Sequence, residues 1–174
     1  MDATLVRGDL IELQCLTKLT EMGFMCLTPY SGASKYDIAV DTGEEILRIQ
    51  CKSSHPPKKE DGLRDYEAIQ IDCICSTVNT KTIKRYHYNN KQIDYFATYY
   101  QGQMYLIPVD ECSTAKTLRF SPPNNGQKKY NKAEDYLVEN VLGHLQDKEY
   151  LNQVREYQIT MFGEQQLSQE EKQK

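Results

Sequence analysis

The segment Tyr36–Ser53 limits the possible folds of this chain more than any other, because it has the pattern of a β-hairpin. Two strand-like runs, Tyr36–Asp41 and Ile46–Ser53, flank residues 42–45, which include Gly43. Four-residue loops built around a turn are common hairpin connections, and glycine adopts the positive φ that tight turns often need. We therefore predict two antiparallel strands here, paired symmetrically about the loop.

The predicted hairpin gathers three polar side chains on one face. Symmetric pairing sets Asp37 opposite Gln50, and directly opposed residues share a face of the sheet. Lys52 comes two residues after Gln50 and points the same way, whereas Ile49 points to the other face. A carboxylate, an amide oxygen and an ammonium within reach of each other suit a hard divalent cation and a phosphate group. The pattern predicts a metal-dependent phosphodiesterase.

A helix before the hairpin contributes a fourth candidate residue. The segment Arg7–Gly23 has helical periodicity and a glycine stop signal, and its apolar stripe consists of Ile11, Cys15, Leu16, Leu19 and Met22. Glu12 falls inside this stripe, where a carboxylate is costly unless it is paired, protonated or bound to a metal. Glu12 could instead cap the helix start or pair with Arg7 or Arg48. The active-site interpretation is favoured because the polar face of the hairpin follows closely in the sequence.

These residues, in this order, resemble the motif of the PD-(D/E)XK nuclease superfamily. In that superfamily a helix supplies a glutamate like Glu12, a hairpin supplies an aspartate like Asp37, and the next strand supplies an (E/D/Q)-x-K motif like Gln50-Cys51-Lys52. The chain looks closest to the branch of group I intron homing endonucleases of cyanobacterial type, and more distantly like archaeal Holliday-junction resolvases. Ile93–Val109 looks like the later strand pair of this branch, and Leu118–Tyr136 looks like its next element.

The resemblance spans roughly residues 5–140 and implies a fold. The expected class is α/β, with a restriction-endonuclease-like core in which helices flank a mixed β-sheet. We expect one nuclease domain over residues 1–146. Residues 147–174 are expected to form a C-terminal helix or tail that takes part in oligomer contacts.

The resemblance also implies the roles of the site residues. Glu12, Asp37, Gln50 and Lys52 would be catalytic, and Mg²⁺ or Mn²⁺ would be held by Asp37, Gln50, the carbonyl of Cys51, and Glu12. Gln50 stands where most of the superfamily has a carboxylate. A glutamine oxygen can bind a metal but carries no charge, so the expected metal affinity is lower. Whether one or two metals bind stays open.

The charge of the chain is unevenly distributed. The net charge is −4, yet residues 48–132 carry fourteen basic and eight acidic side chains, and both flanking segments are acidic. A basic middle segment is where a phosphate backbone would be favoured. Each basic cluster alone is more typical of a solvated surface, but together with the metal site the clusters indicate DNA binding. The predicted contacts are Lys58, Lys59, Lys81, Lys84, Arg85, Arg119, Asn125, Gln127, Lys128 and Lys129.

The rest of the chain yields coarser predictions. Ala68–Cys75 alternates as a strand buried on one face, Ser54–Leu63 is a loop rich in proline and lysine, and Ala133–Gln146 is a helix. The stretch Thr77–Tyr88 is polar and basic, and its structure is left open. The six cysteines lack ligand spacing, so free buried thiols are expected rather than a zinc site.

The function predicted from the sequence is sequence-specific hydrolysis of double-stranded DNA. A homing endonuclease would cut both strands at a long pseudo-palindromic site, which requires a homodimer or a homotetramer. The alternatives are a nuclease of the Holliday-junction-resolvase, restriction or repair type, and a non-catalytic DNA-binding protein of the same fold. We found no signal peptide or long apolar run, so we expect a cytoplasmic protein, associated with the nucleoid when bound to DNA, and no membrane partner.

Overall fold

A mixed five-stranded sheet forms the centre of the protein. The computed structural model describes residues 3–57, 67–79, 82–123 and 127–146. The strand order is β1-β2-β3-β8-β9, with bounds Met25–Leu27, Ile38–Asp41, Ile46–Cys51, Tyr95–Tyr100 and Gln103–Pro108. β3 and β8 are parallel, and the other neighbours are antiparallel. The predicted fold class, a mixed sheet flanked by helices, is therefore confirmed.

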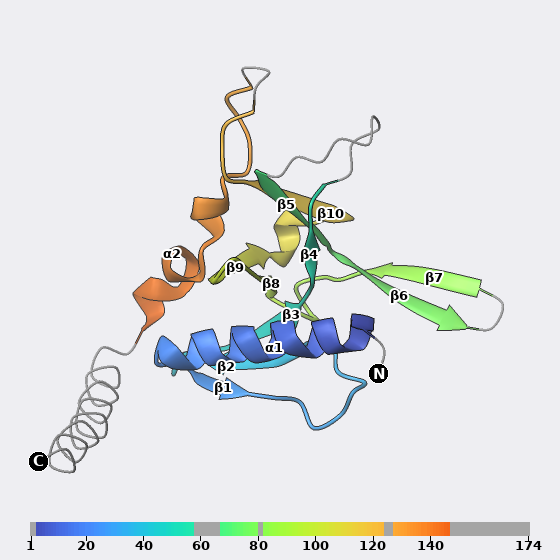
Figure 1. Ribbon diagram of the computed structural model, residues 1–174. Helices are drawn as coiled ribbons and strands as arrows, with labels where there is room; N and C mark the ends of the chain where they lie inside the picture. The colour runs from blue at the N-terminus through green and yellow to red at the C-terminus, as the bar shows by residue number, and fades with distance from the viewer. Residues whose placement is uncertain (1–2, 58–66, 80–81, 124–126, 147–174) are drawn as a thin grey trace, which may run out of the picture.

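Helix α1 (Ala3–Glu21) covers one face of this sheet (Figure 1). Its buried residues Ile11, Cys15 and Leu19, with Met22 directly after the helix, pack into a cluster with side chains of β2, β3, β8 and β9. The predicted apolar stripe is therefore correct, although the helix begins four residues earlier than Arg7. Gly23 ends it in a left-handed conformation (φ +86°), and the next N–H, that of Phe24, donates to the carbonyl of Leu19.

The opposite face of β8 and β9 is covered by a second sheet of three strands, β10-β5-β4. These strands are Ala115–Arg119, Ala68–Asp72 and Ser54–His55. Ile69, Ile71 and Leu118 pack there against Phe96 and Ile107, and all five are fully buried. This sheet contains residues that the sequence had assigned to loops, because β4 occupies the start of the predicted loop Ser54–Leu63.

Two cysteines depart from the expectation of free thiols. Cys73 and Cys112 form a disulfide that joins the end of β5 to the segment after β9. Cys15, Cys26, Cys51 and Cys75 are free. Spacing along the chain could not predict this pair, because the two residues lie 39 positions apart and meet only through the packing of the second sheet.

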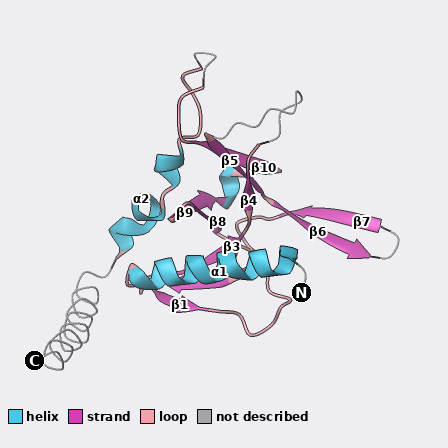
Figure 2. Cartoon of the chain, viewed as in Figure 1, coloured by secondary structure: helices cyan, strands magenta, loops and turns pink. Residues whose placement is uncertain are grey.

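A two-stranded ribbon, β6 (Ile74–Asn79) and β7 (Thr82–His87), projects away from both sheets (Figures 1 and 2). The two strands pair only with each other in the described chain. The ribbon accounts for the stretch that the sequence left open. It also corrects the predicted single strand Ala68–Cys75, which is divided at Cys73 into β5 and the start of β6.

The predicted helix Ala133–Gln146 is only partly correct. The segment consists of a 3-10 turn over Ala133–Tyr136, the short helix α2 (Val138–Leu142) and a second 3-10 turn. Leu137 interrupts it with extended backbone (φ −58°, ψ 136°), because it forms an isolated bridge with Tyr105. The predicted tail, residues 147–174, lies outside the described residues. Within the described chain, no helix combines the length and the apolar character needed to cross a membrane.

Candidate active site

The hairpin predicted from the sequence is formed by β2 and β3. Asp41 pairs with Ile46 and Ile38 pairs with Ile49, which is the predicted register. The connecting turn is closed by a hydrogen bond of 3.1 Å from the Thr42 N–H to the carbonyl of the residue that ends the loop. Gly43 has a φ of +82°, a conformation that glycine adopts without steric cost.

Asp37 lies one residue before the paired part of β2, where the two strands begin to separate. Its N–H donates to the Ile49 carbonyl at 2.9 Å, so its backbone still follows β3. Its Oδ2 accepts a hydrogen bond of 2.7 Å from the Cys51 N–H and a second one from Gln50 Nε2. The carboxylate is therefore fixed against the end of β3, and the predicted contact between Asp37 and Gln50 is present.

The donor set at this point fits a divalent cation. Gln50 Nε2, which donates to Asp37 Oδ2, also donates to the Cys51 carbonyl at 3.3 Å. The carboxylate oxygen of Asp37 and the carbonyl oxygen of Cys51 thus face one position, which the positively polarised N–H group of Gln50 occupies. Hard cations prefer such oxygen ligands. No group of three or more His, Cys, Asp or Glu residues able to hold a metal occurs in the described part of the chain, so a cation here would also rely on amide and backbone oxygens.

Lys52 follows β3 and is held between two elements. Its N–H donates to the Ala97 carbonyl of β8 at 2.8 Å, which places the residue at the parallel junction of the sheet. Its ammonium lies 5.3 Å from the centre of the Tyr88 ring. The Tyr88 hydroxyl in turn donates to Gln50 Oε1 at 3.3 Å. Tyr88 was not predicted as a site residue; its only signal in the sequence is that tyrosines are interleaved in a polar, basic stretch.

Glu12 lies on the third turn of α1, and its position corrects one expectation. The side chain is exposed, so it is not aimed at the core as the apolar stripe suggested. Its pKa is raised above the ordinary value, first by partial burial and then by the nearby charges of Asp37 and Asp9. The proposed cationic partners have other contacts, because Arg7 donates to the Ser54 carbonyl and Arg48 binds an aspartate. Glu12 and Asp37 thus repel each other across one site.

Burial also raises the pKa of Asp37. The hydrogen bond from the Cys51 N–H, the Lys52 charge and the Gln50 amide act in the opposite direction, but they do not outweigh the loss of solvation. Asp37 and Glu12 thus both have raised pKa values, and the charge of Asp37 is one cause of the shift at Glu12. A nearby cation would offset this repulsion between the two carboxylates.

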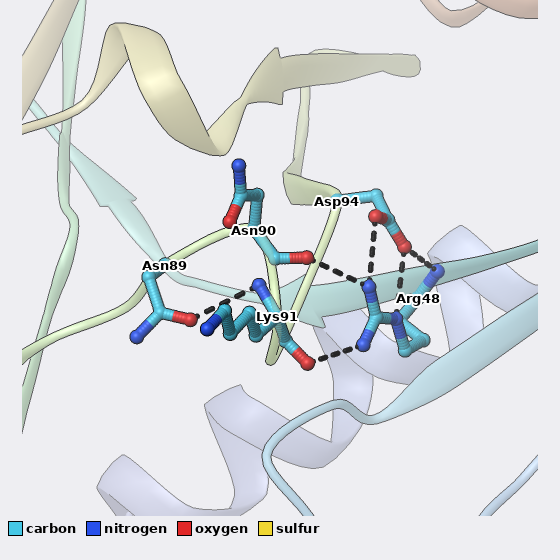
Figure 3. A network of polar contacts seen from close by, with 5 residues as sticks. All are labelled: Arg48, Asn89, Asn90, Lys91 and Asp94. Carbon is cyan, nitrogen blue, oxygen red and sulfur yellow. Dashed lines mark hydrogen bonds and ion pairs between the residues drawn. The ribbon is translucent and has the colours of Figure 1, made fainter.

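Beside this site, an ion pair fastens β3 to the turn that leads into β8 (Figure 3). Arg48 and Asp94 form two hydrogen bonds of 3.0 Å through the guanidinium, and the Arg48 N–H donates to the same carboxylate at 2.7 Å. The guanidinium also donates to the carbonyls of Asn90 and Lys91. Because Arg48 is two residues before Gln50, this network holds the strand that carries the site.

Some of the residues predicted to contact DNA lie within the described part of the chain and some do not. Lys58, Lys59, Lys81 and Asn125 lie outside the described residues, and of Lys84 only the backbone in β7 is described. Arg85 is exposed on β7, and Lys128 is exposed after the proline-rich turn. Arg119, Gln127 and Lys129 line a common cavity of about 500 Å³. The structure thus brings these three together, while Arg85 belongs to the separate ribbon.

Comparisons with known proteins relate most of the chain to nucleases. A family model described as PD-(D/E)XK endonuclease matches residues 3–139. Among solved structures, the chain is similar to a bacterial homing endonuclease, I-Ssp6803I, with a TM-score of 0.61 and 21% sequence identity. The alignment covers 83% of this chain and 93% of that one, which indicates a common fold. A search of curated proteins found no significant match.

Proposed function

Because this chain belongs to the PD-(D/E)XK endonuclease family, we propose that it is a Mg²⁺- or Mn²⁺-dependent enzyme that cuts double-stranded DNA at a specific sequence. One observation carries the metal-dependent part of the proposal. Asp37 Oδ2 and the Cys51 carbonyl oxygen both accept from one polarised donor, Nε2 of Gln50, and the Lys52 ammonium lies over the ring of Tyr88, whose hydroxyl contacts the same amide.

The proposed ligands are Asp37, the Gln50 side chain and the Cys51 carbonyl, with Glu12 binding directly or through a water. When bound, such an ion lowers the pKa of a coordinated water and offsets negative charge on the scissile phosphate. The chain itself supplies rigidity, because Asp37 is held by the Cys51 N–H before any ligand arrives. Hydrolysis forms a new P–O bond to the attacking water oxygen, which loses a proton, while the P–O bond to the leaving sugar oxygen breaks and that oxygen takes up a proton.

Lys52 is the side chain proposed to supply a positive charge to the reacting phosphate. Its ammonium would orient the attacking water or stabilise the additional negative charge on the phosphate oxygens in the transition state. The hydrogen bond from its N–H to Ala97 fixes its backbone, so the ammonium is presented from a defined point at the end of β3. Glu12 lies on α1 close enough to Asp37 for the charge of Asp37 to raise its pKa, together with partial burial, so it holds a proton more readily than an ordinary glutamate.

For DNA recognition we propose the β6–β7 ribbon and the basic cavity. A two-stranded ribbon is one of the elements that fit the major groove of B-DNA. The ribbon carries the exposed Arg85. β7 ends at His87, and the next residue, Tyr88, contacts Gln50 of the proposed site. Arg119, Gln127 and Lys129 offer donors to phosphate oxygens around the cavity.

We further propose the homing role and an oligomeric enzyme. One active site cuts one strand, so a double-strand break requires two copies related by a two-fold axis. A homodimer or a homotetramer, with contacts from residues 147–174, meets that requirement. The support for homing is the similarity in fold to a bacterial homing endonuclease.

A second candidate, a DNA-binding protein without nuclease activity, is favoured by one observation. Gln50 contributes no charge where most of the superfamily has a carboxylate, which weakens metal binding. Restriction, repair or junction-resolving nucleases would share the chemistry of the first proposal and differ only in target.

A single experiment separates these functions. The purified full chain is incubated with a randomised plasmid library, in Mg²⁺ and in EDTA, beside the variant Asp37→Ala and the control Asp110→Ala, an exposed acid after β9. Metal-dependent cutting at one long site, lost only in Asp37→Ala, is the expected result. Cutting of any DNA, or of branched DNA alone, would replace the homing role with a degradative or junction-resolving one. Tight binding without cutting would favour the non-catalytic candidate.

A further inference from the structure

Tyr88 contacts two of the proposed catalytic side chains at once. Its hydroxyl donates to Gln50 Oε1 at 3.3 Å, and the Lys52 ammonium lies 5.3 Å from its ring centre. The ring is half-buried and packs edge-on against Phe96, with 5.3 Å between the ring centres and an angle of 89° between their planes. Tyr88 is therefore fixed by the core, and both catalytic groups rest against it.

The Gln50 amide has two different ends, and the structure shows which end faces which partner. Nε2 points to Asp37 and to the Cys51 carbonyl, while Oε1 points to Tyr88. Only an amide oxygen can bind a cation, so metal binding requires Oε1 to face Asp37 and Nε2 to turn towards Tyr88. A phenol hydroxyl serves both arrangements, because it donates a hydrogen bond and also accepts one.

We propose that Tyr88 is a positioning residue of this nuclease, whose hydroxyl accepts from Gln50 Nε2 in the metal-binding orientation and whose ring supports the Lys52 ammonium. The inference rests on the proposed metal-dependent function. Burial raises the pKa of Tyr88, as do Cys75 and Asp37. Neither the family match nor the sequence pattern assigns a role to this residue.

The two orientations of the amide depend unequally on Tyr88. In the metal-free orientation the amide keeps its two hydrogen bonds to Asp37 and Cys51 when the Tyr88 hydroxyl is removed. In the metal-binding orientation, Tyr88 is the acceptor that the structure places beside Nε2, and a cation on Oε1 polarises the amide and strengthens this donor. Removing the hydroxyl therefore costs the metal-bound form more. A net hydrogen bond of this kind corresponds to roughly threefold to tenfold in an equilibrium constant.

The test measures metal affinity in the absence of DNA, by calorimetric titration of the full chain with Mn²⁺. We expect Tyr88→Phe to weaken binding about threefold to tenfold. In a Gln50→Glu background the same change should alter affinity by less than about twofold, because a carboxylate has two equivalent oxygens and no N–H group to satisfy. The matched control is Tyr99→Phe, which removes a hydroxyl that donates to the Gly102 carbonyl at 3.2 Å in the β8–β9 turn.

A further variant separates the ring from the hydroxyl. Tyr88→Leu removes both, so it should bind Mn²⁺ as weakly as Tyr88→Phe but cut DNA more slowly at saturating metal, by about twofold to fivefold, because Lys52 loses the ring beneath it. Thermal unfolding of each variant checks that the fold persists. If Tyr88→Phe binds Mn²⁺ like the unchanged protein, or weakens binding equally in both backgrounds, the positioning role is refuted.

The outcome also distinguishes this inference from the proposed function. If the unchanged protein cuts DNA and binds Mn²⁺ while Tyr88→Phe behaves identically, only the role of Tyr88 fails. If the unchanged protein neither binds Mn²⁺ nor cuts, the metal-dependent function fails and the role of Tyr88 fails with it.

Discussion

Replacement of Asp94 by alanine should destabilise the fold more than any exposed acid would. Asp94 accepts three hydrogen bonds from Arg48, two from the guanidinium at 3.0 Å and one from the backbone N–H at 2.7 Å. Their side chains are 29% and 25% exposed, so this pair is neither a surface pair nor a buried one. A surface pair contributes about 0–1 kcal/mol, and breaking a buried pair costs about 3–5 kcal/mol.

The backbone contact adds a separate cost. Without the carboxylate, the part-buried N–H of Arg48 loses its acceptor, which costs about 1–3 kcal/mol. The guanidinium still donates hydrogen bonds to the carbonyls of Asn90 and Lys91, which limits the free energy lost when the ion pair is broken (Figure 3). Together these contributions predict that Asp94→Ala lowers the free energy of unfolding by about 2–4 kcal/mol. Asp94→Asn, which keeps one oxygen, should lose about half as much.

Urea denaturation at pH 7 measures this loss, with Asp110→Ala as the control acid, for which a change within about 0.5 kcal/mol is expected. The double variant with Arg48→Met completes a cycle that isolates the coupling between the two side chains. A loss for Asp94→Ala no larger than that of the control would refute the reasoning, because it would mean that the network in Figure 3 does not contribute to the stability of the fold.

Three further predictions concern catalysis, metal binding and the turn. Lys52→Ala should reduce cleavage by about 10²-fold or more with DNA binding largely kept. Lys18→Ala, which removes an ammonium paired with Glu139 of α2, should cut normally. Near-normal rates for Lys52→Ala would remove Lys52 from the mechanism. Burial raises the pKa of Asp37 above 3.8, so the stabilisation linked to its protonated carboxyl is present below that pH and is lost as the pH rises through the raised pKa. Asp37→Asn should therefore raise the Tm of the metal-free protein at pH 7. The affinity for Mn²⁺ should fall as the pH drops towards the raised pKa of Asp37. Gly43→Ala should lower the free energy of unfolding by about 1–2 kcal/mol, because a residue with a Cβ disfavours the φ of +82°, although the added Cβ would meet no other atom. Gly8→Ala, inside α1, should instead raise the free energy of unfolding by up to about 1 kcal/mol.

The parts of the molecule that were predicted correctly are those whose structure follows from the local periodicity of apolar residues. The register of the β2–β3 hairpin follows from a period of two around a four-residue turn, and the buried stripe of α1 follows from a period of 3.6. The contact between Asp37 and Gln50 is a direct consequence of that register. Local pattern and tertiary structure agree here because both faces of the hairpin carry residues of consistent polarity.

The features that sequence reasoning missed depend on partners distant along the chain. Tyr88 reaches Gln50 from 38 residues away, and only the path of the ribbon brings it there. Leu137 has helical neighbours but pairs with Tyr105, so a tertiary contact overrides the local preference for helix. The exposure of Glu12 was missed because it lies at the margin of the apolar stripe, where a helical pattern alone cannot separate a buried position from an exposed one.

The parallel junction between β3 and β8 has a consequence for the order of folding. The hairpins β2–β3 and β8–β9 each close through short turns, whereas residues paired across the junction, such as Arg48 and Asp94, are 46 positions apart. Closing a longer loop costs more chain entropy, so we expect this junction to form after both hairpins. The Lys52 N–H donates to the Ala97 carbonyl of β8, so we expect the end of β3, which carries the proposed catalytic residues, to be one of the last places to become ordered. A chain still emerging from the ribosome would thus contain every proposed catalytic residue well before it has the strand that fixes them.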